Sequence, residues 1–342
     1  MEGKLCKKCV LTDKFFSVRM NEDGLCNYCA EQEKKESNIG TDSITKQFSE
    51  EKNSNSKYDV LLAYSGGKDS TFTLYLLRKI YHLRVLAVTY DNGFLSDVTY
   101  ENIRSVTEAL DVDSMIVAPS RKKLVQVFKF ANEEAKIPPK ALERASAICT
   151  YCIGLVKSIA YEEAIKRKIP YISFGWTPGQ INTGRKVVKM SASMVKQNFK
   201  DMRTSILEYF GEEYRSLFLP EELLEEGENS IPSMFYPFAN RNYNESEIIE
   251  LISQFGWVKP KKTDSNSTNC ILNTYAIHEH IKKYGFHPYA LELAELVRNG
   301  QMDREEALKR LNAPLDKEVI EQIAAEFKKY EKHDEERGRD YE

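Results

Sequence analysis

The feature that most constrains the fold is a short glycine-containing loop at the junction of an apolar run and an amphipathic segment. Ser65-Gly66-Gly67-Lys68-Asp69-Ser70 directly follows the apolar run Tyr58–Tyr64. Glycines let the backbone curl so that successive N–H groups face one anion, and the positive end of a following helix adds to the attraction. The loop is therefore a predicted phosphate site, with Ser65 and Ser70 as hydroxyl donors and Lys68 as the cation.

Asp69 has two candidate roles in this loop: it holds a phosphate-bound Mg²⁺, or it caps the helix that follows. The spacing is not that of a Walker A loop, which has a longer spacer before its Gly-Lys-Ser/Thr. A glycine pair in an ordinary turn is the alternative. We predict that Lys68 and Asp69 are catalytic and that the whole loop Ser65–Ser70 binds nucleotide.

Apolar runs alternate with amphipathic stretches on both sides of the loop, which predicts a doubly wound α/β fold. The predicted strands are Tyr58–Tyr64, Arg84–Tyr90, Ser114–Ala118 and Tyr171–Phe174, and the predicted helices are 70–81, 97–110, 121–135 and 153–168. Ligands of such parallel sheets bind at the carboxyl ends of the strands. The remaining boundaries follow from composition: a cysteine-bracketed module at 1–32, a polar linker at 33–57, the α/β domain with the phosphate loop at 58–240 and a helical region at 241–342.

Composition restricts the setting of the chain. Among its 342 residues there is no apolar run near the roughly 20 residues of a membrane helix, and the N-terminus lacks the apolar stretch of a secretory signal. We therefore expect a cytoplasmic protein without a membrane partner. Seven cysteines in a reducing compartment favour metal binding or catalysis over disulfides. The net charge of −3 gives no global electrostatic case for nucleic acid.

The first four cysteines form two pairs. Cys6 and Cys9 make one Cys-x-x-Cys, and Cys26 and Cys29 make another after 16 intervening residues. This spacing is typical of a structural Zn²⁺ site with four thiolate ligands, and iron is its main rival. A closed four-sulfur site leaves no position for substrate, so we expect it to serve folding or docking.

The loop and its surroundings resemble the PP-loop of the adenine nucleotide alpha-hydrolase superfamily over residues 57–178. The resemblance implies the HUP-type fold and cleavage of ATP between its α- and β-phosphates. It also implies that Asp91, after the second strand, lies near the nucleotide base or ribose. By the same resemblance Gly175, after the fourth strand, packs against adenine. The alternative for Gly93, two residues after Asp91, and for Gly175 is that each is an ordinary turn residue.

A second cysteine set lies beside this loop in the predicted fold. Cys149 and Cys152 precede a helix expected from Ile153, and Cys270 stands in a polar segment. Three thiolates can hold a 4Fe–4S cluster with one open iron, which can carry sulfide to a carbonyl carbon activated by AMP. Alternatives are buried thiols that only pack, a redox pair, or zinc.

Two branches of the superfamily compete for the second reaction step. The Cys-Thr-Tyr-Cys motif with Ile172–Gly175 resembles iron–sulfur tRNA-thiolating enzymes, although this chain has Leu155-Val156-Lys157 in place of an arginine pair. The N-terminal Cys6–Asp13 and Met20–Cys29 resemble N-acetyl sugar amidotransferases of surface-polysaccharide synthesis. That second resemblance implies ammonia from a partner glutaminase.

We expect an ATP-dependent adenylating transferase that releases pyrophosphate, with sulfur favoured over nitrogen as the group that displaces AMP. The alternatives are the amidotransferase and a nucleotide-binding regulator. The expected cofactors are ATP, Mg²⁺, Zn²⁺ and a 4Fe–4S cluster. The expected partners are a small-molecule or carrier-bound acceptor, a sulfur donor or glutaminase, and further copies of the chain in a homo-oligomer. tRNA is not favoured as the acceptor.

Overall fold

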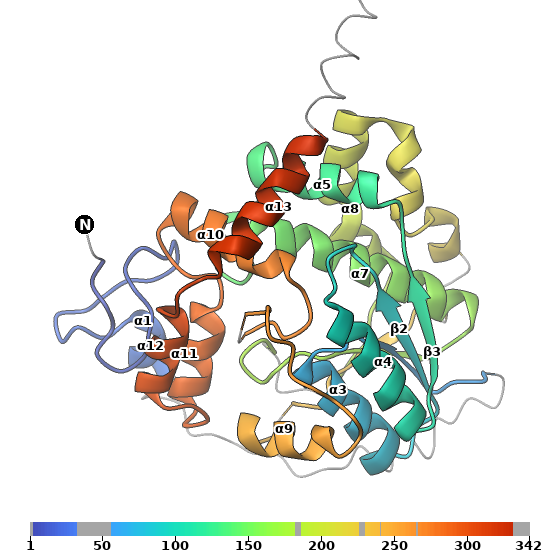
Figure 1. Ribbon diagram of the computed structural model, residues 1–342, viewed down its shortest axis with the longest axis horizontal. Coiled ribbons are helices and arrows are strands. Elements are labelled where there is room, and N and C mark those ends of the chain that lie inside the picture. The colour runs from blue at the N-terminus through green and yellow to red at the C-terminus, as the bar shows by residue number, and fades with distance from the viewer. Residues whose placement is uncertain are drawn as a thin grey trace, which may run out of the picture.

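The fold is built on a mostly parallel six-stranded sheet in a computed structural model (Figure 1). The structure describes residues 3–32, 56–181, 186–225, 230–239, 241–264 and 266–330. The strand order is β3-β2-β1-β4-β6-β5, and only β5 runs antiparallel to its neighbour. The chain moves outward from β1 to β3 and then returns to place β4 on the other side of β1. This reversal makes the gap beyond β1 and β4 the expected ligand crevice.

All four predicted strands are present, and each predicted helix overlaps an observed one. The strands are β1 (Val60–Ala63), β2 (Val85–Tyr90), β3 (Asp113–Val117), β4 (Tyr171–Phe174), β5 (Val187–Val188) and β6 (Ser233–Phe235). The helices of the sheet domain are α3 (Lys68–Tyr75), continued by the π-helix η1 (Leu76–Ile80), α4 (Asp97–Ala109), α5 (Arg121–Glu133), α6 (Pro139–Leu142), α7 (Ala147–Lys166) and α8 (Ala192–Phe210). Two short 3-10 helices follow, η2 (Glu212–Leu217) and η3 (Glu221–Leu224).

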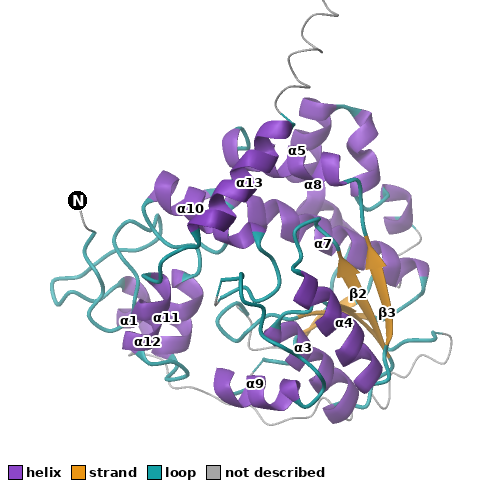
Figure 2. Cartoon of the chain, viewed as in Figure 1, coloured by secondary structure: helices purple, strands orange, loops and turns teal. Residues whose placement is uncertain are grey.

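Helices cover both faces of the sheet, as the doubly wound prediction requires (Figure 2). Residues of β1 alternate between the two faces: Leu62 packs in a core with Leu74 of α3 and Ile103 of α4. Its neighbour Leu61 packs in another core with Ala164 of α7. Every residue of β1, β2 and β4 is buried, which is the pattern of central parallel strands covered on both sides.

The C-terminal region is helical, as predicted. Its helices are α9 (Glu245–Ser253), α10 (Leu272–Tyr284), α11 (Ala290–Arg298), α12 (Arg304–Leu311) and α13 (Lys317–Lys329). Two of these helices begin at a capping side chain: Asn244 accepts from the backbone N–H of Glu247, and Asp303 accepts from that of Glu305. Helix α13, the last described helix, lies across α10 and α5 and so packs against the sheet domain (Figure 1).

The N-terminal module, residues 3–32 with the short helix α1 (Asn27–Gln32), lies beside α11 and α12 (Figure 1). Phe15 stacks on Phe286 with ring centroids 4.0 Å apart. Arg304 of α12 donates to the carbonyls of Cys6 and Cys9. The predicted linker falls almost wholly outside the described residues. No helix in the described part of the chain has both the length and the apolar character to cross a bilayer.

Candidate active site and metal centre

The Ser65–Ser70 loop joins the end of β1 to the first turn of α3. Gly66 has a φ of +72°, and a Cβ there would lie 2.8 Å from the Thr99 side chain, so the loop needs glycine at this position. The Ser65 and Ser70 hydroxyls lie 3.0 Å apart. Helix α3 has no side-chain cap at Gly67, so its positive N-terminal end faces the cavity. This geometry suits a bound phosphate.

Lys68 is buried in an ion-pair network. Its ammonium lies 2.9 Å from Asp69 and 3.9 Å from Glu245, and Tyr243 donates to the other oxygen of Asp69 at 2.9 Å. Burial would lower the pKa of Lys68, but the charges of Asp69 and Glu245 outweigh it and raise the pKa. Lys68 is therefore charged at neutral pH, which is the state that a phosphate-binding lysine needs.

A segment from the C-terminal region forms the other wall of the loop. The backbone N–H of Lys68 donates to Oγ1 of Thr268 at 3.0 Å, and Nε1 of Trp257 donates to the carbonyl of Gly66 at 3.1 Å. A Cβ on Gly67 would approach the side chains of Thr268 and Asn269 at 3.3 Å. No motif in the sequence marks Thr268 and Asn269 as site residues, and the polar character of the segment around Cys270 is the only local signal for them.

The second cysteine set lines the same cavity of about 250 Å³ as the loop. Nδ2 of Asn92 lies 3.2 Å from Sγ of Cys270 and 3.7 Å from Sγ of Cys152, while the thiol of Cys149 contacts Asn273 at 3.4 Å. Cys270, which is far from Cys149 and Cys152 in sequence, is thus brought beside them, and Asn92 bridges Cys152 and Cys270.

The predicted start of the helix after these cysteines is wrong. Helix α7 begins at Ala147 instead of Ile153, because Ser146 caps it and accepts from the backbone N–H of Cys149. Cys149 and Cys152 therefore lie within the first turns of the helix. Residues three apart share a helix face, so both thiols can point into the cavity.

The spacing of the three thiols bears on which metal group they could hold. Burial raises the pKa of Cys149 to about 12 and also raises that of Cys152 and Cys270, so these thiols are neutral without a metal. Among the described residues, only the N-terminal cysteines form a group of three or more ligands within 4.8 Å of one another. A 4Fe–4S cluster is larger than one ion and holds its thiolates further apart, so this spacing is compatible with it.

Asp91 and Gly175 flank the cavity in different ways. Asp91 is not among the cavity-lining residues, and its carboxylate accepts from the N–H of Gly93 and from the Tyr100 hydroxyl. Gly175 does line the cavity. A Cβ there would lie 2.5 Å from Cα of Ser70, so glycine allows β4 to end directly against the loop.

Glu292 of α11 is a cavity residue that no motif in the sequence marks. Its carboxylate accepts from the Thr177 hydroxyl at 2.6 Å and from Nε2 of Gln180 at 2.9 Å. Burial, reinforced by the charge of Asp69, raises the pKa of Glu292 to about 7. The carboxyl group can therefore accept or donate a proton near neutral pH.

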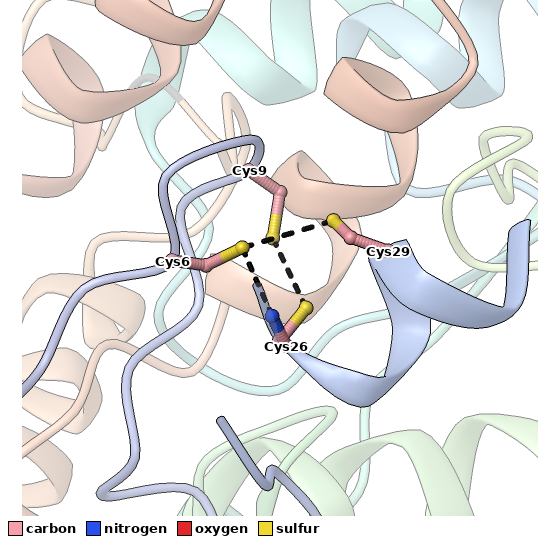
Figure 3. A group of neighbouring side chains, drawn as sticks. All are labelled: Cys6, Cys9, Cys26 and Cys29. Carbon is pink, nitrogen blue, oxygen red and sulfur yellow. Dashed lines mark hydrogen bonds between the residues drawn. The ribbon is translucent and has the colours of Figure 1, made fainter. Parts of the chain in front are cut away.

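The four N-terminal cysteines converge on one point (Figure 3). All four are fully buried, with Sγ atoms 3.8 Å apart for Cys6 and Cys29 and 3.6 Å apart for Cys9 and Cys26. A tetrahedron with Zn–S bonds of about 2.3 Å has edges of about 3.8 Å, so the spacing fits Zn²⁺, or iron in the same geometry. The predicted cluster of four ligands is present.

The metal centre contacts the rest of the chain through charge and hydrogen bonds. The guanidinium of Arg304 donates to the carbonyls of Cys6 and Cys9. From the same module, Ser17 donates through its N–H and its hydroxyl to the two carboxylate oxygens of Glu143, at 2.6 and 2.7 Å. Arg144, the next residue, lines a second cavity described below. The hydrogen bonds from Ser17 to Glu143 therefore support one wall of that second cavity.

Comparisons with known proteins bear on the C-terminal region first. Residues 257–340 match the family described as LPS biosynthesis protein WbpG-like, C-terminal domain. An uncharacterized protein of Methanocaldococcus jannaschii is 25% identical over 268 residues, which cover 78% of this chain and 77% of that protein.

Two solved structures are similar at low TM-scores. A tRNA thiolase, NcsA, from Methanococcus maripaludis, solved with its 4Fe–4S cluster, has a TM-score of 0.34 and 15% identity, covering 92% of this chain and 91% of that one. An NH₃-dependent NAD synthetase from Campylobacter jejuni has a TM-score of 0.32 and 12% identity, covering 79% and 93%. The fold assignment thus depends on the chain's own topology and motif. The Ser65–Ser70 loop after β1 and the doubly wound sheet are the features in which the chain resembles the PP-loop superfamily.

Proposed function

We propose that the protein is an ATP-dependent enzyme that adenylates a carbonyl or amide oxygen of its acceptor. The observation that carries this proposal is the Ser65–Ser70 loop at the topological reversal of the sheet, with the charged Lys68 in the same cavity. The acceptor oxygen attacks the α-phosphorus of ATP and pyrophosphate leaves. The loop N–H groups and Lys68 hold the phosphates in line and stabilise the charge that develops on them. Asp69 would hold Mg²⁺, whose charge neutralises the phosphates.

For the second step, we propose that ammonia displaces AMP from an acetamido sugar during surface-polysaccharide synthesis. The match to a family described as an LPS biosynthesis protein supports this choice over the sulfur route that the sequence favoured. The matched region supplies Thr268, Tyr289 and Glu292 to the nucleotide cavity, so it bears on the chemistry and not only on packing. The ammonia comes from a partner glutaminase.

In the second step, ammonia replaces AMP at the adenylated carbon. The nitrogen of ammonia bonds to the adenylated carbon, the carbon–oxygen bond to AMP breaks, and AMP leaves with that electron pair. One proton must leave the new C–NH₃⁺ group. Glu292, held by Thr177 and Gln180 at the side of the cavity, is the carboxylate that accepts it.

Sulfur transfer is the second candidate, because Cys149, Cys152 and Cys270 line the nucleotide cavity together. These three residues would hold a 4Fe–4S cluster, which when bound supplies sulfide to the adenylated carbon. In that case Asn92, which contacts Cys152 and Cys270, would orient the cluster-binding thiolates.

Product analysis tests the adenylation step. The enzyme is incubated with ATP, Mg²⁺, ammonium and a panel of acetamido sugars and their phosphate esters. We expect AMP and pyrophosphate from the wild type, and none from Lys68→Ala or Asp69→Ala. Lys79→Ala, which removes an exposed lysine from the same helical stretch, is the matched control and should keep full activity. ADP and orthophosphate as products, or ATP binding without any pyrophosphate release over hours, would refute the proposal.

Iron analysis separates nitrogen from sulfur transfer. Protein purified without oxygen should hold well below one iron atom per chain after reconstitution, and Cys270→Ala should keep its ammonium-dependent activity. A brown protein with several irons and matching labile sulfide, inactivated by Cys270→Ala, would instead establish the sulfur route.

A further inference from the structure

A second cavity of about 610 Å³ adjoins the nucleotide cavity. The two cavities have four lining residues in common, and these form the boundary between them: Ile153, Trp176, Gln180 and Glu292. A ligand in the second cavity would therefore reach the nucleotide cavity. Nothing in the adenylation chemistry uses this space.

One wall of this second cavity is aromatic. The Trp176 ring is stacked 4.6 Å from Phe174, at an angle of 9°, and 5.8 Å from Tyr236, at 23°. Trp176 and Tyr236 are only partly buried, and both line the cavity. A wall of this kind packs against the C–H face of a sugar ring or against another flat, weakly polar ligand.

Cationic side chains also line the second cavity. Lys157 of α7 lines it, with its ammonium 5.2 Å from the centre of the Trp176 ring. No carboxylate of the described residues lies within ion-pair distance of Lys157, and burial lowers its pKa. Arg144 is a second lining cation. Among the lining residues that the structure describes, Glu292 is the only acid, and its two oxygens already accept hydrogen bonds from the protein.

A cation in such surroundings lacks the compensation that burial normally demands. The ring of Trp176 offers a cation–π contact, which is weaker than a charge-assisted hydrogen bond to an anion. An anionic ligand group beside Lys157 would supply that bond, and Arg144 would add to the attraction.

We propose that this second cavity is the acceptor subsite, and that it takes a sugar ring against Trp176 and Tyr236 with an anionic substituent, phosphate or carboxylate, at Lys157. The acyl oxygen of the acceptor then faces the nucleotide cavity through the boundary at Glu292. This inference rests on the proposed function, which names the acceptor as an acetamido sugar, and adds its place and its charge.

The two tryptophans of the chain give separate reporters for a binding test. Trp257→Phe leaves only Trp176, in the second cavity, whereas Trp176→Phe leaves only Trp257, which contacts the nucleotide loop. The probes are N-acetylglucosamine 1-phosphate, glucuronate and neutral N-acetylglucosamine. In the Trp257→Phe protein we expect a saturable fluorescence change with one of the charged sugars, and which of them binds identifies the anionic group. The neutral sugar should bind about tenfold more weakly or worse.

Lysine variants in the Trp257→Phe background link this binding to Lys157. Lys157→Met should weaken binding of the charged sugar by about tenfold or more, while Lys157→Arg keeps most of it. Lys166→Met is the control, because Lys166 is on the same helix but pairs with Glu162 outside the cavity. Lys157→Met in the Trp176→Phe background should bind ATP as tightly as its parent.

Two results would overturn the acceptor subsite: equal affinity of Lys157→Met and wild type for the charged sugar, or no binding of either charged sugar to a protein that binds ATP. The failure of the proposed function looks different. If charged sugars bind through Lys157 but AMP never forms, the reaction is wrong and the subsite stands. If AMP forms and Lys157→Met leaves the KM of the acceptor unchanged, only the subsite is wrong.

Discussion

Oγ1 of Thr268 accepts a hydrogen bond from the backbone N–H of Lys68 at 3.0 Å, and so joins two residues 200 positions apart. Both residues are buried. The contact couples the nucleotide loop to the region that matches the WbpG-like domain. The C-terminal region is therefore part of the candidate active site, and its loss would expose the loop.

Replacing Thr268 should destabilise the protein because it leaves a buried donor unpaired. Thr268→Val keeps the shape of the side chain but removes the acceptor for Lys68, which should cost about 1–3 kcal/mol in the free energy of unfolding. Thr268→Ser retains the hydroxyl and should lose much less. Urea unfolding of the three proteins measures this, and equal stability of the valine and serine variants would contradict the assigned hydrogen bond.

Metal removal should act on the N-terminal module. We expect one Zn²⁺ per chain by elemental analysis, and Cys9→Ser should lose it, since a tetrahedral site needs all four thiolates. Loss of the metal should lower the Tm by on the order of 5 °C or more. Cys149→Ser should keep the zinc, because Cys149 lies in the other cysteine set. Zinc loss in both variants would show that the two sets are not independent.

The stability of the protein should depend on pH through Glu292. Its pKa in the folded protein, about 7, lies above the usual value of 4.5 for a glutamate, so the folded state binds the proton more tightly than the unfolded state does. The stabilisation that this tighter proton binding gives the folded state is fully present below about pH 4.5 and is lost as the pH rises through about 7. Glutamine at this position never ionises. The free energy of unfolding of Glu292→Gln should therefore rise relative to that of the wild type as the pH rises, by at most about 3 kcal/mol. Urea unfolding at pH 5.5, 7 and 8.5 tests this, and a pH-independent difference would contradict the raised pKa.

The activity should respond to the same group. A proton acceptor must be ionised, so the ammonium-dependent rate should fall as the pH drops below about 7. Glu292→Gln should be about 10²- to 10⁴-fold slower. The wild-type to variant rate ratio, which cancels the protonation of ammonia itself, should rise through pH 7. The control is Glu295→Gln on the same helix, since Glu295 pairs with Arg298. A ratio that is flat with pH would leave Glu292 only a structural role.

The sequence predicted the parts of the molecule that depend on local patterns. The four strands β1 to β4 are apolar runs of the right length, and the glycine loop after Tyr64 marks the phosphate site by itself. The two cysteine pairs of the N-terminus carry their ligand geometry in their spacing.

The parts that escaped prediction depend on long-range packing or lack a local signal. Helix α7 is apolar on most of its circumference, so periodicity did not mark its start, and only the cap at Ser146 does so. The strands β5 and β6 span two and three residues and are too short to produce an alternating pattern. The approach of Thr268 and Glu292 to the loop depends on tertiary contacts that no spacing in the sequence encodes.

If an acceptor oxygen attacks the α-phosphorus of ATP, that oxygen must end in AMP. Oxygen-isotope transfer shows whether it does. N-acetylglucosamine 1-phosphate labelled with oxygen-18 in its acetamido group is turned over with ATP and ammonium, and the products are analysed by mass spectrometry. We expect the label in the phosphate of AMP, and we expect the pyrophosphate to be unlabelled. Label in orthophosphate released alongside ADP, or AMP that forms without any label, would contradict this expectation.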